Sequence, residues 1–91
     1  MLLKLLNCTI RKETKAAIFV EVDTKQLLKH QAKEVERRES IWLPKSVCII
    51  DRKEVKVKAF GVNFIELKEK EIARFRNARL VEIKVQKFGE D

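Results

Sequence analysis

The stretch Ala16-Ala17-Ile18-Phe19-Val20-Glu21-Val22 decides the class of fold, because its branched apolar side chains recur at every second position. A period of two places Ile18, Val20 and Val22 on one side of an extended chain and predicts a strand with one buried face. Residues 3–10 before it are largely apolar, and residues 11–15 are polar. We therefore predict a strand over 3–10, a turn over 11–15, and a hairpin with the strand that follows.

Three later segments have the same strand character. Residues 40–50 are mostly apolar around Pro44, which has no amide donor and therefore belongs at an edge, a bulge or a bend. Residues 54–60 alternate between charged and small apolar side chains after the polar turn 51–53. Residues 80–88 alternate as well. The pattern predicts a second hairpin over 40–60 and a closing strand over 80–88.

Two segments favour a helix. Residues 24–39 contain no glycine, proline or aromatic residue, and Leu28, Ala32 and Val35 form a narrow apolar stripe at helical spacing. We predict a helix that docks on one side. The alternative is a long, flexible hairpin tip, because so thin a stripe buries little area. Residues 68–77 also predict a helix, and residues 62–67 fit either its first turns or a short strand.

The predicted order of elements is β-β-α-β-β-α-β. This order indicates an α+β protein with about five short antiparallel strands and one or two helices. A small, partly open β-barrel of SH3-like or OB-like kind fits best, because each strand is short and connected by a hairpin. An open antiparallel sheet backed by the two helices is the alternative.

Length and composition limit the kind of protein. The chain has 91 residues, of which 45% are hydrophobic and 38% charged, with only two glycines and one proline. We predict a single globular domain over residues 1–91, and collagen-like or low-complexity chains are excluded. The net charge is +7, from 21 Lys and Arg against 14 Asp and Glu. Such a charge favours a nucleic acid or an acidic protein surface as the partner.

The residues that common catalytic and metal sites require are scattered or missing. His30 is the only histidine and lies in a polar run, and Cys8 and Cys48 are far apart in the sequence, which does not fit a zinc site. The two glycines are isolated, so there is no phosphate-binding loop. We predict a protein that is not an enzyme and that takes no metal and no cofactor. A site built only of carboxylates stays open, because 14 acidic residues are spread along the chain.

Two features bear on the compartment. Both cysteines lie in apolar stretches, where a thiol usually packs as a small, reduced hydrophobe. The leading run Leu2–Leu6 is interrupted by Lys4 and is shorter than the roughly 7–15 apolar residues of a secretion signal. No run reaches the ~18 apolar residues of a membrane span. We expect a cytoplasmic protein without a membrane partner.

One short motif carries a resemblance. The run Trp42-Leu43-Pro44-Lys45-Ser46, with the strand Lys15–Val22 before it, resembles small uncharacterised proteins of bacteriophages and mobile elements. In those proteins a similar strand is soon followed by Trp, an aliphatic residue, Pro, Lys and Ser. The resemblance covers about 30 residues and departs at Val47, where the pattern commonly has Gln. It implies a small β-barrel-like domain encoded near replication or recombination genes, and no particular activity.

The positive charge is highest over residues 41–65, where five basic side chains stand against two acidic ones, a net of +3. We predict a small accessory protein that binds single strands or the backbone of DNA or RNA with little sequence specificity. Phosphates would contact the lysines, and Trp42 would stack on an unpaired base. The predicted nucleic-acid-binding residues are Trp42, Lys45, Lys56, Lys58 and Lys84. The alternative is an interaction module that inhibits or modulates a host protein, such as a defence nuclease, and the ordinary interpretation of the charges is a solvated surface.

The leading leucines bear on assembly. Leu2, Leu3, Leu5 and Leu6 place apolar side chains on both faces of the first strand, so one face needs a cover from outside its own core. The stripe of the predicted 24–39 helix supplies that cover, or a second copy does. We predict a homodimer with Leu3 and Leu5 at or near its interface.

Overall fold

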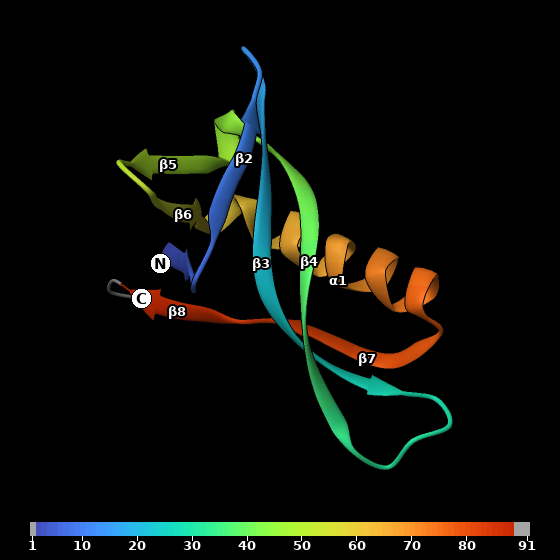
Figure 1. The fold of residues 1–91 in the computed structure, drawn as a ribbon. Helices are drawn as coiled ribbons and strands as arrows, with labels where there is room; N and C mark the ends of the chain where they lie inside the picture. Colours follow the sequence, from blue (N-terminus) through green and yellow to red (C-terminus); the bar gives the residue numbers. More distant parts are fainter. Residues whose placement is uncertain (1, 89–91) are drawn as a thin grey trace.

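The computed structural model describes residues 2–88. Eight strands, one α-helix and two short 3-10 helices follow one another along this part of the chain (Figure 1). Their bounds are β1 (Leu2–Leu5), β2 (Thr9–Glu13), β3 (Ala17–Leu28), β4 (Glu34–Pro44), η1 (Lys45–Val47), β5 (Cys48–Asp51), β6 (Glu54–Lys58), η2 (Ala59–Gly61), α1 (Val62–Arg76), β7 (Ala78–Ile83) and β8 (Val85–Phe88).

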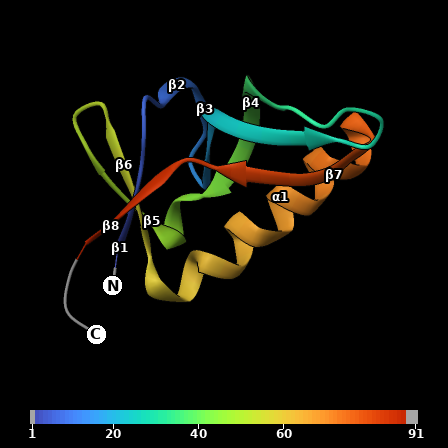
Figure 2. The ribbon, with the colours of Figure 1, turned by 90° about the horizontal axis from the view of Figure 1, so that it is seen from below.

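The strands form two antiparallel sheets. In the first, called the β1 sheet here, the strand order is β5-β6-β1-β8. In the second, the β3 sheet, β3 pairs with β4 along almost its whole length, and its other side pairs first with β2 and then with β7. Figure 1 shows the strands of the β1 sheet crossing those of the β3 sheet, and Figure 2 shows α1 lying along β7. The α+β class is confirmed, and the two sheets do not close into a barrel.

One core joins the two sheets and the helix. The β1 sheet contributes Leu5, Val55 and Val57, the β3 sheet contributes Ile18, Val20 and Leu43, and α1 contributes Ile65 and Ile72. Gly61 sits where η2 meets η1, and a Cβ atom there would lie 2.6 Å from the Cβ of Val47. That position therefore requires glycine, because any side chain would push the two turns apart.

The predicted helix over residues 24–39 is wrong. Residues 17–28 and 34–44 are instead the two strands of one long hairpin, paired from Ala17 with Pro44 to Leu27 with Glu34. This is the alternative that the thin apolar stripe left open. The two-residue period of Ile18, Val20 and Val22 continues through Thr24 and Gln26, which are equally buried. The period was hidden because polar residues occupy those inward positions.

Other boundaries also differ from the prediction. The first predicted strand breaks at Asn7, whose φ of 51° turns the chain, so β1 joins one sheet and β2 the other. The last predicted strand divides at Lys84 in the same way, into β7 and β8. Residues 62–67 are helical rather than extended, and α1 ends at Asn77 in a left-handed C-cap. The described residues therefore contain eight strands where about five were predicted, and one α-helix where one or two were predicted.

Leu3 and Leu5 lie inside the protein's own core. Their side chains are 4% and 1% exposed, between the β1 sheet and the rest of the core. The prediction placed them at or near an interface with a second copy, but strands and a helix of the same chain already cover both residues. Cys8 and Cys48 are both free thiols, the first half-buried and the second buried. Within residues 2–88, the helix is not long and apolar enough to cross a bilayer.

Candidate nucleic-acid interface

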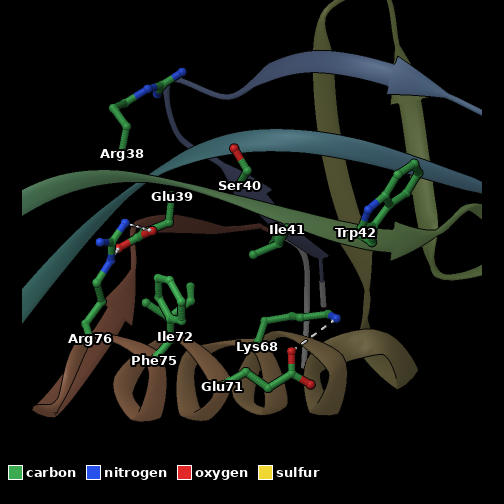
Figure 3. Close-up of a pocket in the computed structure, with 10 residues that line it drawn as sticks. All are labelled: Arg38, Glu39, Ser40, Ile41, Trp42, Lys68, Glu71, Ile72, Phe75 and Arg76. Atoms are coloured by element: carbon green, nitrogen blue, oxygen red, sulfur yellow. Dashed lines mark hydrogen bonds and ion pairs between the residues drawn. The ribbon is translucent and has the colours of Figure 1, made fainter.

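The five predicted binding residues do not lie together. Trp42 lies on the outward side of β4, in the β3 sheet, with its ring 4.9 Å from the ring of Phe19 on the neighbouring strand. The two rings are tilted by 39°, so Phe19 covers part of the indole. The Trp42 ring points to the side of β4 away from α1 (Figure 3), and Trp42 lies in a different sheet from Lys56 and Lys58.

Lys45 and Lys84 are held by carboxylates. Lys45 Nζ lies 2.6 Å from Glu13, and Lys84 Nζ lies 2.8 Å from Glu36 of β4. The hydrogen bond from Lys84 to Glu36 raises the pKa of this lysine. Lys84 was predicted to bind nucleic acid together with Lys56 and Lys58, but it does not share their surface, because the chain passes from one sheet to the other at this residue. Its backbone N–H donates to Asp23 of β3.

Lys56 and Lys58 do share one surface. Both project from the outer face of the β1 sheet, opposite the buried Val55 and Val57. The register places Lys56 beside Lys4, and Lys58 beside Leu2. No carboxylate of residues 2–88 lies within 4 Å of either ammonium group, whereas Lys4 is paired with Glu54 at 3.4 Å. Lys58 Nζ also donates to the carbonyl oxygen of Ser46 at 3.3 Å.

Two phenylalanines accompany these lysines. Lys56 Nζ lies 5.6 Å from the centre of the Phe88 ring, and Lys58 Nζ lies 5.6 Å from the centre of the Phe60 ring. Both rings are exposed. We call Lys56, Lys58, Phe60 and Phe88 the outer-face cluster. The sequence prediction missed the two aromatic residues, although Phe60 continues the two-residue spacing of Lys56 and Lys58.

A second group of charged side chains lies between β4 and α1 (Figure 3). Glu39 accepts hydrogen bonds from Arg76 at 2.8 and 3.0 Å and from Gln26 at 2.7 Å. Gln26 also donates to Thr24 at 2.9 Å. Burial by itself would raise the pKa of Glu39, but the hydrogen bonds from Arg76 and Gln26 outweigh it and lower this pKa. We call Thr24, Gln26, Glu39 and Arg76 the buried polar network, of which Arg76 is the exposed member.

The buried polar network ties the end of α1 to β4. Glu39 and Arg76 satisfy each other, and no nucleophile activated by a neighbouring base lies among the four residues. Within residues 2–88, no group of three or more His, Cys, Asp or Glu side chains is placed to hold a metal ion. Family models, curated proteins and solved structures were compared with the chain, and none matches it.

Proposed function

We propose that this protein binds single-stranded nucleic acid through the outer-face cluster. One observation supports this best. Lys56 and Lys58, without a carboxylate partner among the described residues, each lie over an exposed phenylalanine ring. Proteins that bind single strands combine cations, which contact phosphates, with aromatic rings, on which bases stack. The outer face of the β1 sheet, together with Phe60 of the adjoining η2, presents both kinds of side chain.

The chemistry of the outer-face cluster favours backbone contact with little base specificity. Lysine is a point charge and does not form the paired hydrogen bonds by which arginine identifies a guanine edge. Phenylalanine stacks on any base, since every base has a π face. Ile49, exposed on β5 beside Lys56, extends the apolar part of this surface.

The test is a titration of a labelled single-stranded oligonucleotide at two salt concentrations. Replacement of both lysines by glutamate (Lys56→Glu with Lys58→Glu) should abolish or strongly weaken binding. The milder change to alanine should reduce the slope of log K against log salt by about 1.4, roughly 0.7 for each single-strand phosphate that a lysine no longer neutralises.

The matched control replaces Lys29 and Lys33 by glutamate. These two lysines lie in the loop between β3 and β4, at the far end of the long hairpin from the β1 sheet (Figure 1). The change in net charge is the same, so equal losses in both variants would mean that only the overall charge matters. Absence of binding by the unaltered protein at low salt would contradict the proposal and favour an acidic protein as the partner.

Stacking is tested separately at Phe60. This ring is exposed in η2, so Phe60→Ala should leave the fold intact. It should weaken binding by about 1–3 kcal/mol, the usual contribution of one stacked base. Trp42→Ala should change binding much less, because Trp42 lies on the other sheet. The reverse order would place the nucleic acid on β4 instead.

A further inference from the structure

The outer edge of β4 has no partner among residues 2–88, because β4 pairs with β3 only. The N–H group of Lys45 donates to the carbonyl oxygen of Ala16 at 2.8 Å. In an antiparallel pair the hydrogen-bonded positions alternate, so the odd-numbered residues of β4 bond to β3. The outward N–H and C=O groups belong to Glu36, Arg38, Ser40 and Trp42. These groups form an open template for another strand.

A stripe of exposed apolar residues on α1 lies beside this edge. The helix runs antiparallel to β4, with Phe64 near Pro44 and Arg76 bonded to Glu39. Phe64, Leu67 and Phe75 fall on one side of the helix at i, i+3 and i+11, and Glu71, paired with Lys68, lies on the same side between Leu67 and Phe75. Leu67 is 54% exposed and Phe75 is 79% exposed. Exposed apolar residues gathered in this way mark an interaction surface.

We propose that a second copy of this chain covers both features. In this dimer the two β4 strands pair along their outer edges across a two-fold axis, and the two α1 stripes meet beneath them. A single added peptide strand would satisfy the edge of β4 but would lie in the plane of the sheet. Phe75 is 79% exposed even though the guanidinium of Arg76 lies 5.0 Å from its ring centre, so only a second layer would cover it. A second copy brings a strand and a helix together, and its contact is self-complementary.

The charges along β4 favour one register. A two-fold axis at Arg37, Arg38 or Glu39 would place two like charges opposite each other, which is destabilising. An axis at Ser40 avoids this and uses the outward groups of Arg38, Ser40 and Trp42. On that axis Arg38 lies opposite the partner's Trp42, and Ser40 opposite the partner's Ser40. An axis nearer Pro44 would use fewer groups, because proline has no N–H to donate.

Side-chain directions along β4 agree with this arrangement. Glu39 and Ile41 point from β4 toward α1, and Ser40 and Trp42 point to the opposite side (Figure 3). Ile41 would therefore extend a shared core with the helix stripes, and Ser40 would leave the outer side of the joined sheet open. The charged half of β4, from Glu34 to Glu39, would lie mainly toward the ends of the contact.

The test is the molar mass in solution, by light scattering and sedimentation from low to high micromolar concentration. The unaltered chain should be a dimer. Ser40→Pro should make it monomeric, because the outward N–H is removed while every bond to β3 remains. Ser40→Ala keeps that N–H and should remain dimeric. Phe75→Asp should weaken the dimer about tenfold or more, whereas Leu80→Asp, an equally drastic change at an exposed leucine of β7, should not.

A second measurement tests the register. Ser40→Cys should form a disulfide between two copies under mild oxidation, located at position 40 by peptide mass, because directly paired residues lie within disulfide reach. Glu36→Cys should not, since it would lie opposite the partner's Pro44. A monomeric unaltered chain would overturn the proposal. So would a dimer that survives both Ser40→Pro and Phe75→Asp, because its contact would lie elsewhere. If Ser40→Pro does not fold, Phe75→Asp still decides, since Phe75 contributes little to the core.

Discussion

The two halves of β3 are buried equally but contain different chemistry. In the first half Ile18, Val20 and Val22 point inward, and in the second half Thr24 and Gln26 do, and all five are 0% exposed. The first half meets the β1 sheet in an apolar core. The second half joins the buried polar network with Glu39 and Arg76. Burial therefore alternates along the whole strand, although hydropathy alternates only along its first half.

The difference shows what each half contributes to the fold. Apolar contact is not directional, so the first half stabilises the fold without demanding exact partners. Hydrogen bonds are directional, and an unpaired buried group costs free energy. Thr24 Oγ1 donates to the carbonyl oxygen of Arg37 at 2.9 Å, and Gln26 reaches Glu39 across the same strand pair. These bonds form in one register of β3 and β4 only, so the second half selects that register.

The largest expected effect lies in the apolar half. Leu43 of β4 lies opposite Ile18 and is fully buried, so Leu43→Ala removes apolar contacts and leaves a cavity. The free energy of unfolding should fall by about 2–5 kcal/mol. Denaturant titration measures this free energy. A loss much smaller than about 2 kcal/mol would mean that the core is poorly packed around Leu43. Ile50→Ala, at an exposed position of β5, is the control with little expected change.

A smaller effect is expected in the polar half. Glu39→Ala leaves Arg76 without its carboxylate, but the Arg76 side chain is 34% exposed and water can hydrate it. Gln26 keeps one of its two acceptors, the hydroxyl of Thr24. We expect a loss of about 1–3 kcal/mol, less than for Leu43→Ala. Glu34→Ala, on the exposed end of the same strand, should change stability very little. A loss for Glu39→Ala larger than for Leu43→Ala would reverse the comparison.

The pH dependence of stability follows from the same carboxylate. The pKa of Glu39 is lowered in the folded protein, so its ionised form contributes stability above the unfolded value of about 4.3. This contribution is lost as the pH falls through the folded pKa. The contribution of Asp23 to stability is also lost as the pH falls, because hydrogen bonds from Asn7 and Arg38 lower the pKa of this carboxyl in the folded protein. Glu39→Gln should remove only the Glu39 part, so its stability should fall less steeply with acid than that of the unaltered protein.

Glu69 should affect the pH dependence of stability in the direction opposite to Glu39, so it provides a control for that assignment. Burial raises its pKa, against a hydrogen bond from the backbone N–H of Ile83. A raised folded pKa means that ionisation of Glu69 costs stability as the pH rises through that value. Glu69→Gln should therefore make the acid loss steeper. If both glutamine variants changed the slope in the same direction, one of the two assignments would be wrong.

Much of the fold can be predicted from the spacing of apolar residues along the chain and from the polar turns between the segments. The alternation at residues 16–22, 54–60 and 80–88 predicted strands, which the structure contains as part of β3, as β6 and as β7 with β8, although residues 59–60 belong to η2. The helix predicted over residues 68–77 lies within α1 up to its C-cap at Asn77. Residues 24–39 were wrongly predicted as a helix because Thr24, Gln26 and Glu39 are polar side chains at buried positions. The alternation of burial in these strands is therefore not accompanied by an alternation of hydropathy. The breaks at Asn7 and Lys84 depend on which sheet each half joins, and that choice is made by long-range packing.

The candidate site was only half predictable. Lys56 and Lys58 were predicted from the basic segment 41–65, and both project from the outer face of the β1 sheet. Their rings come from η2 and from β8, which is separated from β6 by β1, so only the sheet order shows that Phe88 is near Lys56. Lys45 and Lys84 were counted as free charges, whereas Glu13 and Glu36 pair with them from other strands. Sequence spacing does not show such pairs.

The smallest effect is expected for Gln26→Leu, which converts the second half of β3 toward the chemistry of the first. The carboxylate of Glu39 only accepts, so the amide nitrogen of Gln26 must face it, and the amide oxygen is left buried without a partner among the described residues. Leucine removes that unpaired oxygen and nearly conserves volume. Glu39 keeps Arg76, and Thr24 keeps its bond to Arg37, so no new unpaired atom arises. Stability should change by less than about 1 kcal/mol in either direction.

Gln26→Glu is the contrasting variant, because it places two carboxylates side by side and should destabilise the protein at neutral pH. If Gln26→Leu lowered the free energy of unfolding as much as Leu43→Ala does, the hydrogen bonds of the Gln26 amide would be as important for stability as the apolar core. The second half of β3 would then be stabilised by hydrogen bonds rather than by apolar contact.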